Sequence, residues 1–358
     1  MRIAFDVSPL SHPLLGIGNY MQGSLAGLAE ASAGKNEIVA FAPTSIRGPE
    51  RIRAALAEID VELRTWRVPI SHALRTGWSM LAHPAAERLI GRFDVLHFSD
   101  WMYPPQRGGV RATTIHDLVP LHHPEWTTAR TRSMHGRKYR NAAATCDVVF
   151  VNSEFTGRDV IQTLGVSAER VRVARPAAKN VFRAEGPAAD LGATYVLTVA
   201  TLEPRKNLQA LIEAHRLLGG DVLLAVVGGE GWGEQPLLDG PRIRRLGYVS
   251  DEELARLYRG AAVAVYPSRF EGFGIPVIEA MACGVPVVVS SHESLDEASG
   301  QAAVRADPDD PSAIAAAIER SLAERERLVA AGLEHSRTFT WRAVGKTFLR
   351  GYEEALAR

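Results

Sequence analysis

The 358-residue chain has few of the features that mark secreted or membrane-spanning proteins. Its two cysteines, Cys146 and Cys283, are far apart in apolar surroundings, so we expect reduced core residues rather than a disulfide or a metal site. No apolar run approaches the roughly 18 residues that span a bilayer. Asp6 interrupts the opening run MRIAFDV, which suits a first strand better than a signal peptide. We therefore expect a cytoplasmic protein, at most peripheral to the inner face of a membrane.

The chain also has no net charge. The chain has 41 basic and 41 acidic residues and no stacking-aromatic motif, so nucleic-acid binding is not expected. The halves differ, because residues 1–185 give 23 − 17 = +6 and residues 186–358 give 18 − 24 = −6. The basic residues of the predicted helix Thr127–Ala144 are typical of a solvated surface. The alternative is contact with anionic lipid or with a lipid-diphosphate acceptor.

Strand-like runs alternate with helical patterns along nearly the whole chain, which predicts parallel α/β architecture. The expected strands are Arg2–Val7, Glu37–Phe41, Val61–Thr65, Val95–Phe98, Ala112–His116, Val148–Asn152, Tyr195–Ala200, Val222–Val227, Ile243–Leu246, Ala262–Tyr266, Val285–Ser290 and Ala302–Val304. The expected helices are Gly18–Ala31, Thr127–Ala144, Ser153–Leu164, Asn207–Leu217, Asp251–Arg259, Ile275–Cys283, Pro311–Ala331 and Trp341–Leu356. The aperiodic stretch Arg175–Gly192 is predicted to link two doubly wound, Rossmann-like domains that face a central cleft.

The segment Ser268–Val289 combines two glutamates with glycines and a short apolar helix. Glu279 falls inside that helix, where a buried carboxylate is costly unless something pairs with it. Glu271 falls in the glycine-rich loop just before the helix, whose first N–H groups suit a phosphate. Together these features predict a site for a polyhydroxylated, phosphorylated ligand.

A basic pair and a run of glycines follow two other predicted strands. In TLEPRKN, Arg205 and Lys206 lie near a helix N-terminus, where cations oppose the helix dipole, so we expect an anion between them. The alternative is two exposed basic residues in a turn. Gly228 begins GGEGWG, and glycines at a strand end let a ligand approach the backbone. This run lacks the G-x-G-x-x-G spacing of dinucleotide binding.

The order TLEPRKN, VVGGEGW, LGYVSDEELARLY and YPSRFEGFGIPVIEAMACGVPVVVS resembles the donor domain of the retaining glycosyltransferases of family 4. Glu271 and Glu279 match the E-x7-E motif of that family. The resemblance is strong over Tyr195–Ser291 and weaker in the first half, where LGIGNY, TIHDLVPLHHPEW and VNSEFT resemble bacterial mannosyltransferase-like members. It implies the GT-B fold, with an acceptor-binding domain at 1–180 and a nucleotide-sugar donor domain at 181–340. The C-terminal helix, 341–358, would pack back on the first domain.

The resemblance also implies roles for individual residues. The catalytic residues would be those at the diphosphate and the transferred sugar, namely Glu271, His116, Arg205 and Lys206. Donor binding would involve the ribose ligand Glu279, the first-domain loop with Gly16 and Gly18, the base pocket around Gly228 and Tyr248, and the backbone N–H groups of Phe273, Gly274 and Ile275. From the residues alone, a single histidine at a strand end is more often structural than functional.

The implied reaction moves a sugar from a nucleotide-diphosphate donor to a glycan or lipid-linked acceptor, with GDP-mannose as the first choice of donor. UDP-sugars, dTDP-sugars and a GT-B sugar-nucleotide epimerase stay open, as does a non-enzymatic nucleotide-sugar sensor. A covalent route through Glu271 and a front-face route are both compatible with these residues. No cofactor or metal is expected, because Asp307-Pro308-Asp309 matches the Asp-x-Asp pattern but precedes a helix far from the other motifs.

Overall fold

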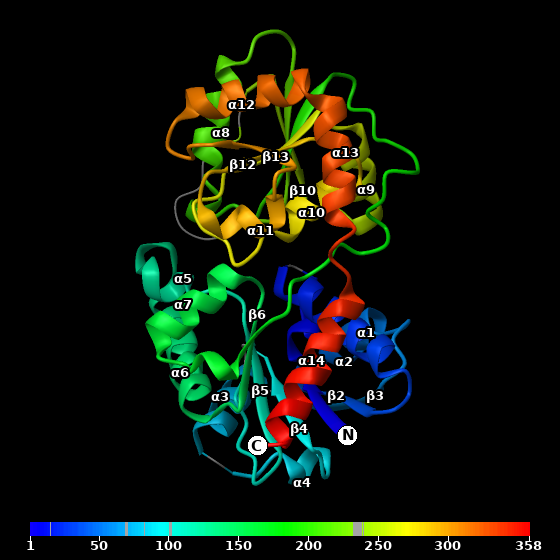
Figure 1. The fold of residues 1–358 in the computed structure, drawn as a ribbon, viewed down its shortest axis with the longest axis vertical. Coiled ribbons are helices and arrows are strands. Elements are labelled where there is room, and N and C mark those ends of the chain that lie inside the picture. The colour runs from blue at the N-terminus through cyan, green and yellow to red at the C-terminus, as the bar shows by residue number, and fades with distance from the viewer. Residues whose placement is uncertain (15, 69–70, 82, 100–101, 232–237, 239) are drawn as a thin grey trace. The chain divides into compact units, whose positions relative to one another are not determined.

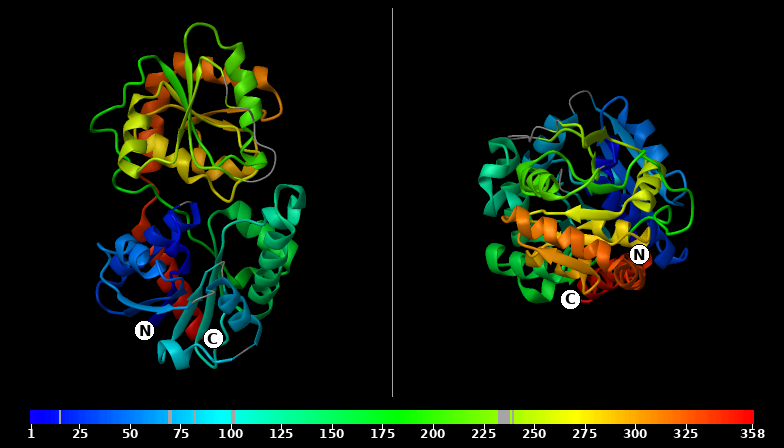
Figure 2. Two further views of the ribbon diagram at one scale, coloured as in Figure 1. Left: turned by 180° about the vertical axis from the view of Figure 1, so that it is seen from behind. Right: turned by 90° about the horizontal axis from the view of Figure 1, so that it is seen from above.

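The computed structural model describes residues 1–358 except 15, 69–70, 82, 100–101, 232–237 and 239. The chain divides into two compact units. Unit 1 comprises Met1–Leu121, Arg130–Pro176 and Thr340–Arg358, and unit 2 comprises His122–Ala129 and Ala177–Phe339. In each unit a central sheet has helices on both faces (Figures 1 and 2).

The sheet of unit 1 has seven parallel strands in the order β3-β2-β1-β4-β5-β6-β7. The strands are β1 (Arg2–Asp6), β2 (Glu37–Thr44), β3 (Glu62–Arg67), β4 (Val95–Phe98), β5 (Val110–Ile115), β6 (Val148–Val151) and β7 (Val171–Val173). The order reverses between β1 and β4. In doubly wound sheets, ligands bind beyond the carboxyl ends of the strands at such a switch point.

The helices of unit 1 cover both faces of this sheet. They are α1 (Gly16–Ser32), α2 (Gly48–Ala55), α3 (Ser71–Leu81), α4 (Glu87–Ile90), α5 (Val119–His122), α6 (Ala129–Thr145), α7 (Glu154–Leu164) and α14 (Trp341–Leu356). Alternate residues of β6 point to opposite faces of the sheet. On one face, Val149 and Val151 pack in a core with Tyr139 of α6 and Val160 of α7. On the other face, the Phe150 ring lies 4.5 Å from that of Phe348 in α14.

The C-terminal helix α14 packs along α1 within unit 1. Two glycines allow the close approach: a Cβ on Gly345 would lie 2.0 Å from the carbonyl oxygen of Gly27. Farther along α14, the Tyr352 hydroxyl lies 2.6 Å from Nδ1 of the buried His97. The amphipathic pattern of Trp341–Leu356 therefore buries its apolar side against the first sheet.

The sheet of unit 2 has six parallel strands in the order β10-β9-β8-β11-β12-β13. The strands are β8 (Tyr195–Val199), β9 (Leu223–Val227), β10 (Ile243–Gly247), β11 (Val263–Tyr266), β12 (Val287–Ser290) and β13 (Ala303–Ala306). The helices are α8 (Leu208–Leu217), α9 (Asp251–Gly260), α10 (Ile275–Ala282), α11 (Asp296–Ser299), α12 (Pro311–Ala323) and α13 (Arg325–Ser336). Helices α9 and α10 pack on one face, and α8 and α12 pack on the other. The switch point lies between β8 and β11.

Several predictions of elements were wrong. The predicted helix Pro311–Ala331 is two helices that meet at Glu324, because α12 packs on the α8 face whereas α13 packs against α10 on the opposite face. The short edge strand β7 and the helices α2, α3, α4, α5 and α11 were not predicted. Most of the expected linker belongs to unit 2, where Phe182 joins the core.

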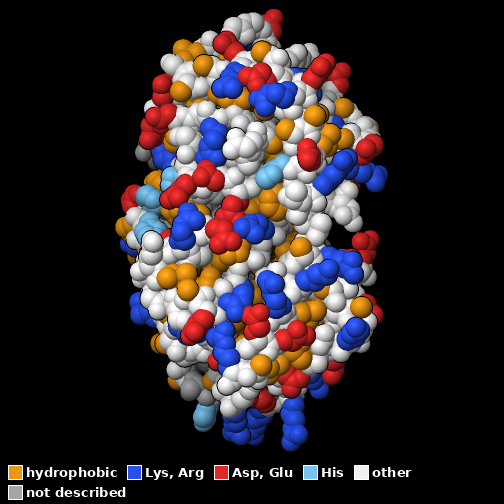
Figure 3. Space-filling model, viewed as in Figure 1, with side chains coloured by type: hydrophobic (Ala, Val, Ile, Leu, Met, Phe, Trp, Pro, Cys, Tyr) orange, Lys and Arg blue, Asp and Glu red, His pale blue; other side chains and the backbone are white. Residues whose placement is uncertain are grey.

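Other expectations agree with the structure. Cys146 and Cys283 are buried and free, as predicted. Acidic and basic side chains are interspersed over the face shown in Figure 3. Among the described residues, no helix has both the length and the apolar character needed to cross a membrane.

Candidate active site

Two loops meet at the switch point of unit 2. The chain leaves β8 into a 3-10 turn, Pro204–Lys206, and leaves β11 into the loop that carries Glu271. Asn207 adopts a φ of +55°, which asparagine tolerates better than most residues. Its buried Nδ2 donates to the carbonyl oxygens of Pro267 at 3.1 Å and Pro308 at 2.6 Å. Asn207 thereby ties the ends of β8, β11 and β13 together.

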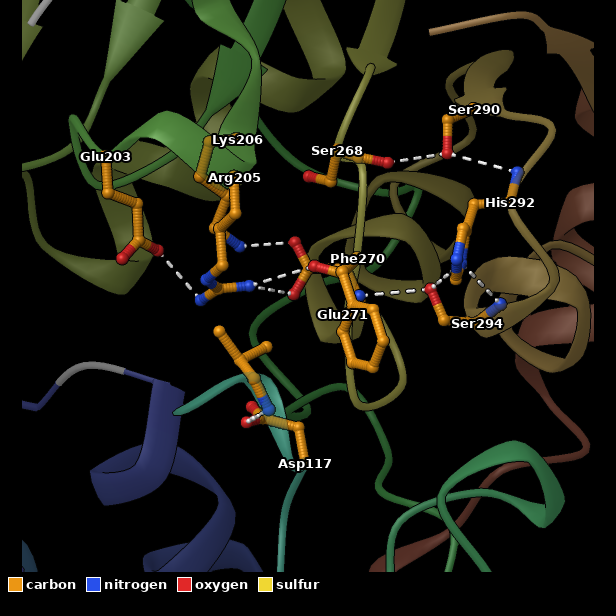
Figure 4. A network of polar contacts seen from close by, with 11 residues as sticks. Asp117, Glu203, Arg205, Lys206, Ser268, Phe270, Glu271, Ser290, His292 and Ser294 are labelled. Carbon is orange, nitrogen blue, oxygen red and sulfur yellow. Dashed lines mark hydrogen bonds and ion pairs between the residues drawn. The ribbon is translucent and has the colours of Figure 1, made fainter. Parts of the chain in front are cut away.

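The carboxylate of Glu271 lies between the two cations of the neighbouring turn (Figure 4). Its Oε2 lies 2.7 Å from Arg205 Nη1, and its Oε1 lies 2.5 Å from Lys206 Nζ. On its other side, Arg205 Nη2 lies 2.8 Å from Oε1 of the buried Glu203. Two carboxylates and two cations thus form one cluster, and the sequence motifs TLEPRKN and RFEGFG converge on it.

The charge state of Glu271 follows from this cluster. Burial by itself raises the pKa of Glu271, but Arg205 and Lys206, with hydrogen bonds from Lys206 and Ser268, lower it to about 2. Glu271 is therefore ionised at neutral pH. The sequence predicted an anion between Arg205 and Lys206, and in the structure the Glu271 carboxylate occupies that position. The cations lie in a separate turn before α8, which begins at Leu208.

A third loop supports the backbone around Glu271. The N–H of Glu271 donates to Ser294 Oγ at 3.0 Å, and Ser294 Oγ lies 2.9 Å from His292 Nδ1. Ser290 Oγ donates to the carbonyl oxygen of Ser268 at 2.6 Å. Ser290 is the last residue of β12, and His292 and Ser294 follow it. None of the three was predicted as a site residue. Glu203 was also missed, although its position two residues before Arg205 was a signal that it could orient that side chain.

Glu279 lies in a second polar cluster, on α10. It is buried near Tyr258, whose hydroxyl lies 2.8 Å from that of Tyr266, and near the pair of Lys179 Nζ and Asp251 Oδ2, which are also 2.8 Å apart. Burial, with the Asp251 charge, raises the pKa of Glu279 to about 8, against the opposing effect of Lys179 and Tyr258. The two glutamates of one motif thus have opposite charge states: Glu271 is ionised and Glu279 is largely protonated near pH 7.

The raised pKa of Glu279 predicts a pH-dependent stability. Between about pH 5 and pH 8 the folded chain holds a proton on Glu279 that the unfolded chain has lost, so stability falls as pH rises through this window. We expect the free energy of unfolding of the wild type to fall by on the order of a few kcal/mol across this window. In Glu279→Gln, which has no carboxyl group at this position, that fall is expected to be absent. Melting temperatures of both proteins measured from pH 5 to pH 9 test this. Glu271→Gln is the control, because Glu271 is ionised throughout that range. A pH-independent difference between wild type and Glu279→Gln would contradict the assignment.

The start of α10 depends on Gly274. This residue has a φ of +103°, and a Cβ there would lie 2.7 Å from Leu295 Cδ2. Phe273 is buried in the core of unit 2, and Ile275 is the first residue of α10. The first N–H groups of a helix have no partner within it, which applies to Ile275, whereas Gly274 is the N-cap and Phe273 precedes it. The contacts of these three backbone groups with a donor stay a prediction.

Gly228 and Tyr248 occupy adjacent strand ends. Gly228 N donates to the carbonyl oxygen of Gly247 at 2.8 Å, and Tyr248, which follows Gly247, is 58% exposed. A Cβ on Gly228, whose φ is +140°, would lie 2.0 Å from the carbonyl oxygen of Ala200. Position 228 therefore requires glycine because the backbone of the β8–α8 loop packs closely against it. The sequence prediction had explained this glycine only by the approach of a ligand. Trp232 and Gly233, the last two residues of the GGEGWG run, lie outside the described part of the chain.

The predicted first-domain residues all lie in unit 1. His116 directly follows β5, and its ring packs edge-on against that of Tyr20 in α1, with centroids 4.8 Å apart. Asn152, after β6, places Nδ2 3.1 Å from His116 Nδ1. Gly16 and Gly18 lie in the first turn of the same helix α1, so the prediction of a glycine loop there is wrong. Asn152 was not predicted as a site residue, although it is the second residue of the VNSEFT motif.

Among the described residues, no group of three or more His, Cys, Asp or Glu side chains could hold a metal ion. The Asp307–Asp309 segment, however, is not far from the other motifs in space. Asn207 donates to the Pro308 carbonyl oxygen, and Asp309 Oδ1 lies 2.8 Å from Arg269 Nη2. The segment therefore packs beside the Glu271 loop, with Asp309 paired to an arginine.

Solved structures share this architecture of two α/β units. The chain superimposes over 99% of its length on the sucrose-phosphate synthase of Thermosynechococcus elongatus, covering 99% of that chain with a TM-score of 0.72 and 22% identity. It matches Anabaena Alr3699/HepE in complex with UDP-glucose over 99% of this chain and 100% of that chain, with a TM-score of 0.71 and 16% identity. The fold is GT-B, and the predicted α/β class is confirmed.

Sequence comparison places the chain within this class. The model described as Glycosyltransferase Family 4 matches residues 20–177, and the model described as Glycosyl transferases group 1 matches residues 193–324. The O-antigen chain mannosyltransferase B of Escherichia coli is 31% identical over 95% of this chain and 96% of its own. The chain therefore belongs to the family 4 glycosyltransferases, as the motifs predicted.

Other relatives are less similar. The serotype-specific mannosyltransferase WbdA of Escherichia coli is 28% identical over 67% of this chain, which spans about a third of the length of WbdA. The D-inositol 3-phosphate glycosyltransferase of Thermobifida fusca is 29% identical over 76% of this chain and 72% of its own. The chain is thus a glycosyltransferase with mannosyltransferases among its relatives.

Proposed function

We propose that the chain is a retaining, metal-independent mannosyltransferase that uses GDP-mannose and a glycan or lipid-linked acceptor in polysaccharide biosynthesis, at the cytoplasmic face of a membrane. The single observation that carries the proposal is the cluster of Arg205, Lys206 and Glu271 at the switch point of unit 2. Two mannosyltransferase relatives at 28% and 31% identity support mannose as the transferred sugar.

In this mechanism the bond between C1 of the sugar and the diphosphate oxygen breaks, and its electron pair leaves with the nucleoside diphosphate. Arg205 and Lys206 stabilise the charge that develops on that diphosphate. Glu271 contacts the transferred sugar, and Glu279 binds the ribose hydroxyls. The acceptor oxygen bonds to C1 on the face that the diphosphate leaves, and its proton passes to the departing phosphate. In the covalent alternative, Glu271 first forms an ester at C1, which the acceptor then displaces.

The donor can be identified from ligand-induced stabilisation. A ligand that binds only the folded state raises the melting temperature by mass action. We therefore propose a thermal-shift screen of GDP-mannose, GDP, UDP-glucose, UDP-N-acetylglucosamine and dTDP-sugars, followed by assays of sugar transfer with the donors that bind. Stabilisation by UDP- or dTDP-sugars alone would replace GDP-mannose as the donor. Conversion of the donor to an epimer without acceptor would instead support the epimerase alternative.

Full transfer activity is expected in excess EDTA. In the proposed mechanism the two cations at 205 and 206 supply the positive charge at the diphosphate that Mg²⁺ or Mn²⁺ supplies in metal-dependent phosphate chemistry. The measurement is the initial rate with and without chelator, and then with added Mn²⁺. A rate that falls in EDTA and returns with Mn²⁺ would overturn the metal-independent mechanism without affecting the assignment of the donor.

A further inference from the structure

A groove lies in unit 1 between α3 and α6 and is separate from the residues of the proposed active site. It has a volume of about 510 Å³. It is lined by Ala73, Thr76, Gly77 and Met80 of α3 and by Arg130, Ser133, Met134 and Arg137 of α6. In each helix these residues are three or four positions apart, so they form one stripe along each helix. The groove therefore runs along the two helices.

Large apolar side chains are exposed on the α3 side of the groove. Leu74 is 50% exposed, Met80 is 60% exposed and Leu81 is 74% exposed. Leu74 and Leu81 are seven positions apart, so they lie on the same side of α3, next to the stripe that includes Met80. Exposed apolar side chains that gather in this way mark a surface that another molecule or a membrane covers.

The charge on the α6 side has one sign. Neither the α3 segment SHALRTGWSML nor the α6 segment ARTRSMHGRKYRNAAAT contains an acidic residue. Arg130 and Arg137 are two helical turns apart, which places them about 10 Å from each other along the axis. Arg137 Nη1 donates to Ser133 Oγ at 3.0 Å, so both residues belong to the wall of the groove. The surface thus combines basic groups with apolar side chains.

We propose that this α3–α6 surface docks on an anionic phospholipid bilayer. Arg130 and Arg137 contact lipid phosphates, while Leu74, Met80 and Leu81 insert among the upper parts of the acyl chains. Charge complementarity favours this occupant, because the arginines attract the anionic headgroups and no carboxylate of either helix repels them. A helix surface with basic and apolar side chains lies in the membrane interface, where both groups are satisfied.

The test is co-sedimentation of the full chain with phosphatidylcholine vesicles that contain or lack phosphatidylglycerol, with no sugar donor present. We expect binding only to the phosphatidylglycerol vesicles, weakened by added salt. Each arginine near an anionic surface contributes roughly fivefold to partitioning, so R130Q/R137Q is expected to bind about 25-fold more weakly. M80Q/L81Q is expected to bind several-fold more weakly at unchanged charge.

The matched control is R53Q/R88Q, which removes two exposed arginines of α2 and α4 in the same unit. Its binding is expected to stay near wild type. An equal loss for R53Q/R88Q and R130Q/R137Q would overturn the proposal in favour of general electrostatic attraction. No binding of the wild type to phosphatidylglycerol vesicles would overturn it in favour of a protein partner on this surface. Because the assay contains no donor, neither result bears on the proposed transfer reaction.

Discussion

Glu271→Gln is expected to lower the rate of sugar transfer by about 10²–10⁴-fold while the chain stays folded. Glutamine keeps the size of the side chain but removes the negative charge that lies between Arg205 Nη1 and Lys206 Nζ. That charge is present at all working pH values, because the pKa of Glu271 is lowered to about 2. Transfer depends on it if Glu271 stabilises positive charge on the sugar or attacks C1. The measurement is kcat, with the melting temperature as a check of folding.

The same variant separates catalysis from binding of the diphosphate. Both cations remain in Glu271→Gln, so GDP is expected to bind at least as tightly as to the wild type. Asp309→Asn is the matched control, because it removes one carboxylate from the neighbouring segment, where Asp309 pairs with Arg269. Its transfer rate is expected to stay near wild type. Transfer by Glu271→Gln at the wild-type rate would remove Glu271 from the mechanism.

Much of the fold could be predicted because each sheet is parallel and buried on both faces. Its strands are continuous apolar runs, and β8, β11 and β12 lie within a few residues of the predicted ranges. The elements that were missed are short or irregular. The edge strand β7 has three half-buried residues, which is too few for a periodic pattern. The α3 segment carries Leu74, Met80 and Leu81 on its exposed side, so its hydrophobic pattern does not indicate which side is buried.

The candidate site could be predicted in part for a similar reason. Motifs at the ends of β8 and β11 must meet if these strands are neighbours, so the convergence of Arg205, Lys206 and Glu271 follows from topology. The hydrogen bonds that support this site cannot be predicted from the topology. Ser294 accepts a hydrogen bond from the Glu271 N–H, and Asn207 donates to two carbonyl oxygens. These backbone groups are distant in sequence, and no spacing rule reveals the pairs. The role of Gly228 was also hidden, because it depends on the position of the Ala200 carbonyl oxygen.

Lys206→Ala is expected to weaken GDP binding by roughly 10- to 100-fold, the effect of losing one hydrogen bond to a charged group. Lys206 Nζ pairs with Glu271, and the Lys206 side chain is only 15% exposed, so its charge is poorly screened by water. A diphosphate bound at this position would pair with the same Lys206 ammonium group. Isothermal titration calorimetry of GDP and of guanosine measures the effect. The loss is expected for GDP alone, because guanosine has no phosphate to bind.

Lys346→Ala is the matched control for Lys206→Ala, since it removes one exposed ammonium group from α14 in unit 1. Its dissociation constant for GDP is expected to equal that of the wild type. An unchanged constant for Lys206→Ala as well would show that the diphosphate binds elsewhere. If wild type binds UDP or dTDP but not GDP, the same comparison is made with that nucleotide, and the assignment of Lys206 is tested independently of the base. A wild type that binds no nucleoside diphosphate would reject the donor site itself, because Lys206 would then have only its structural pairing with Glu271.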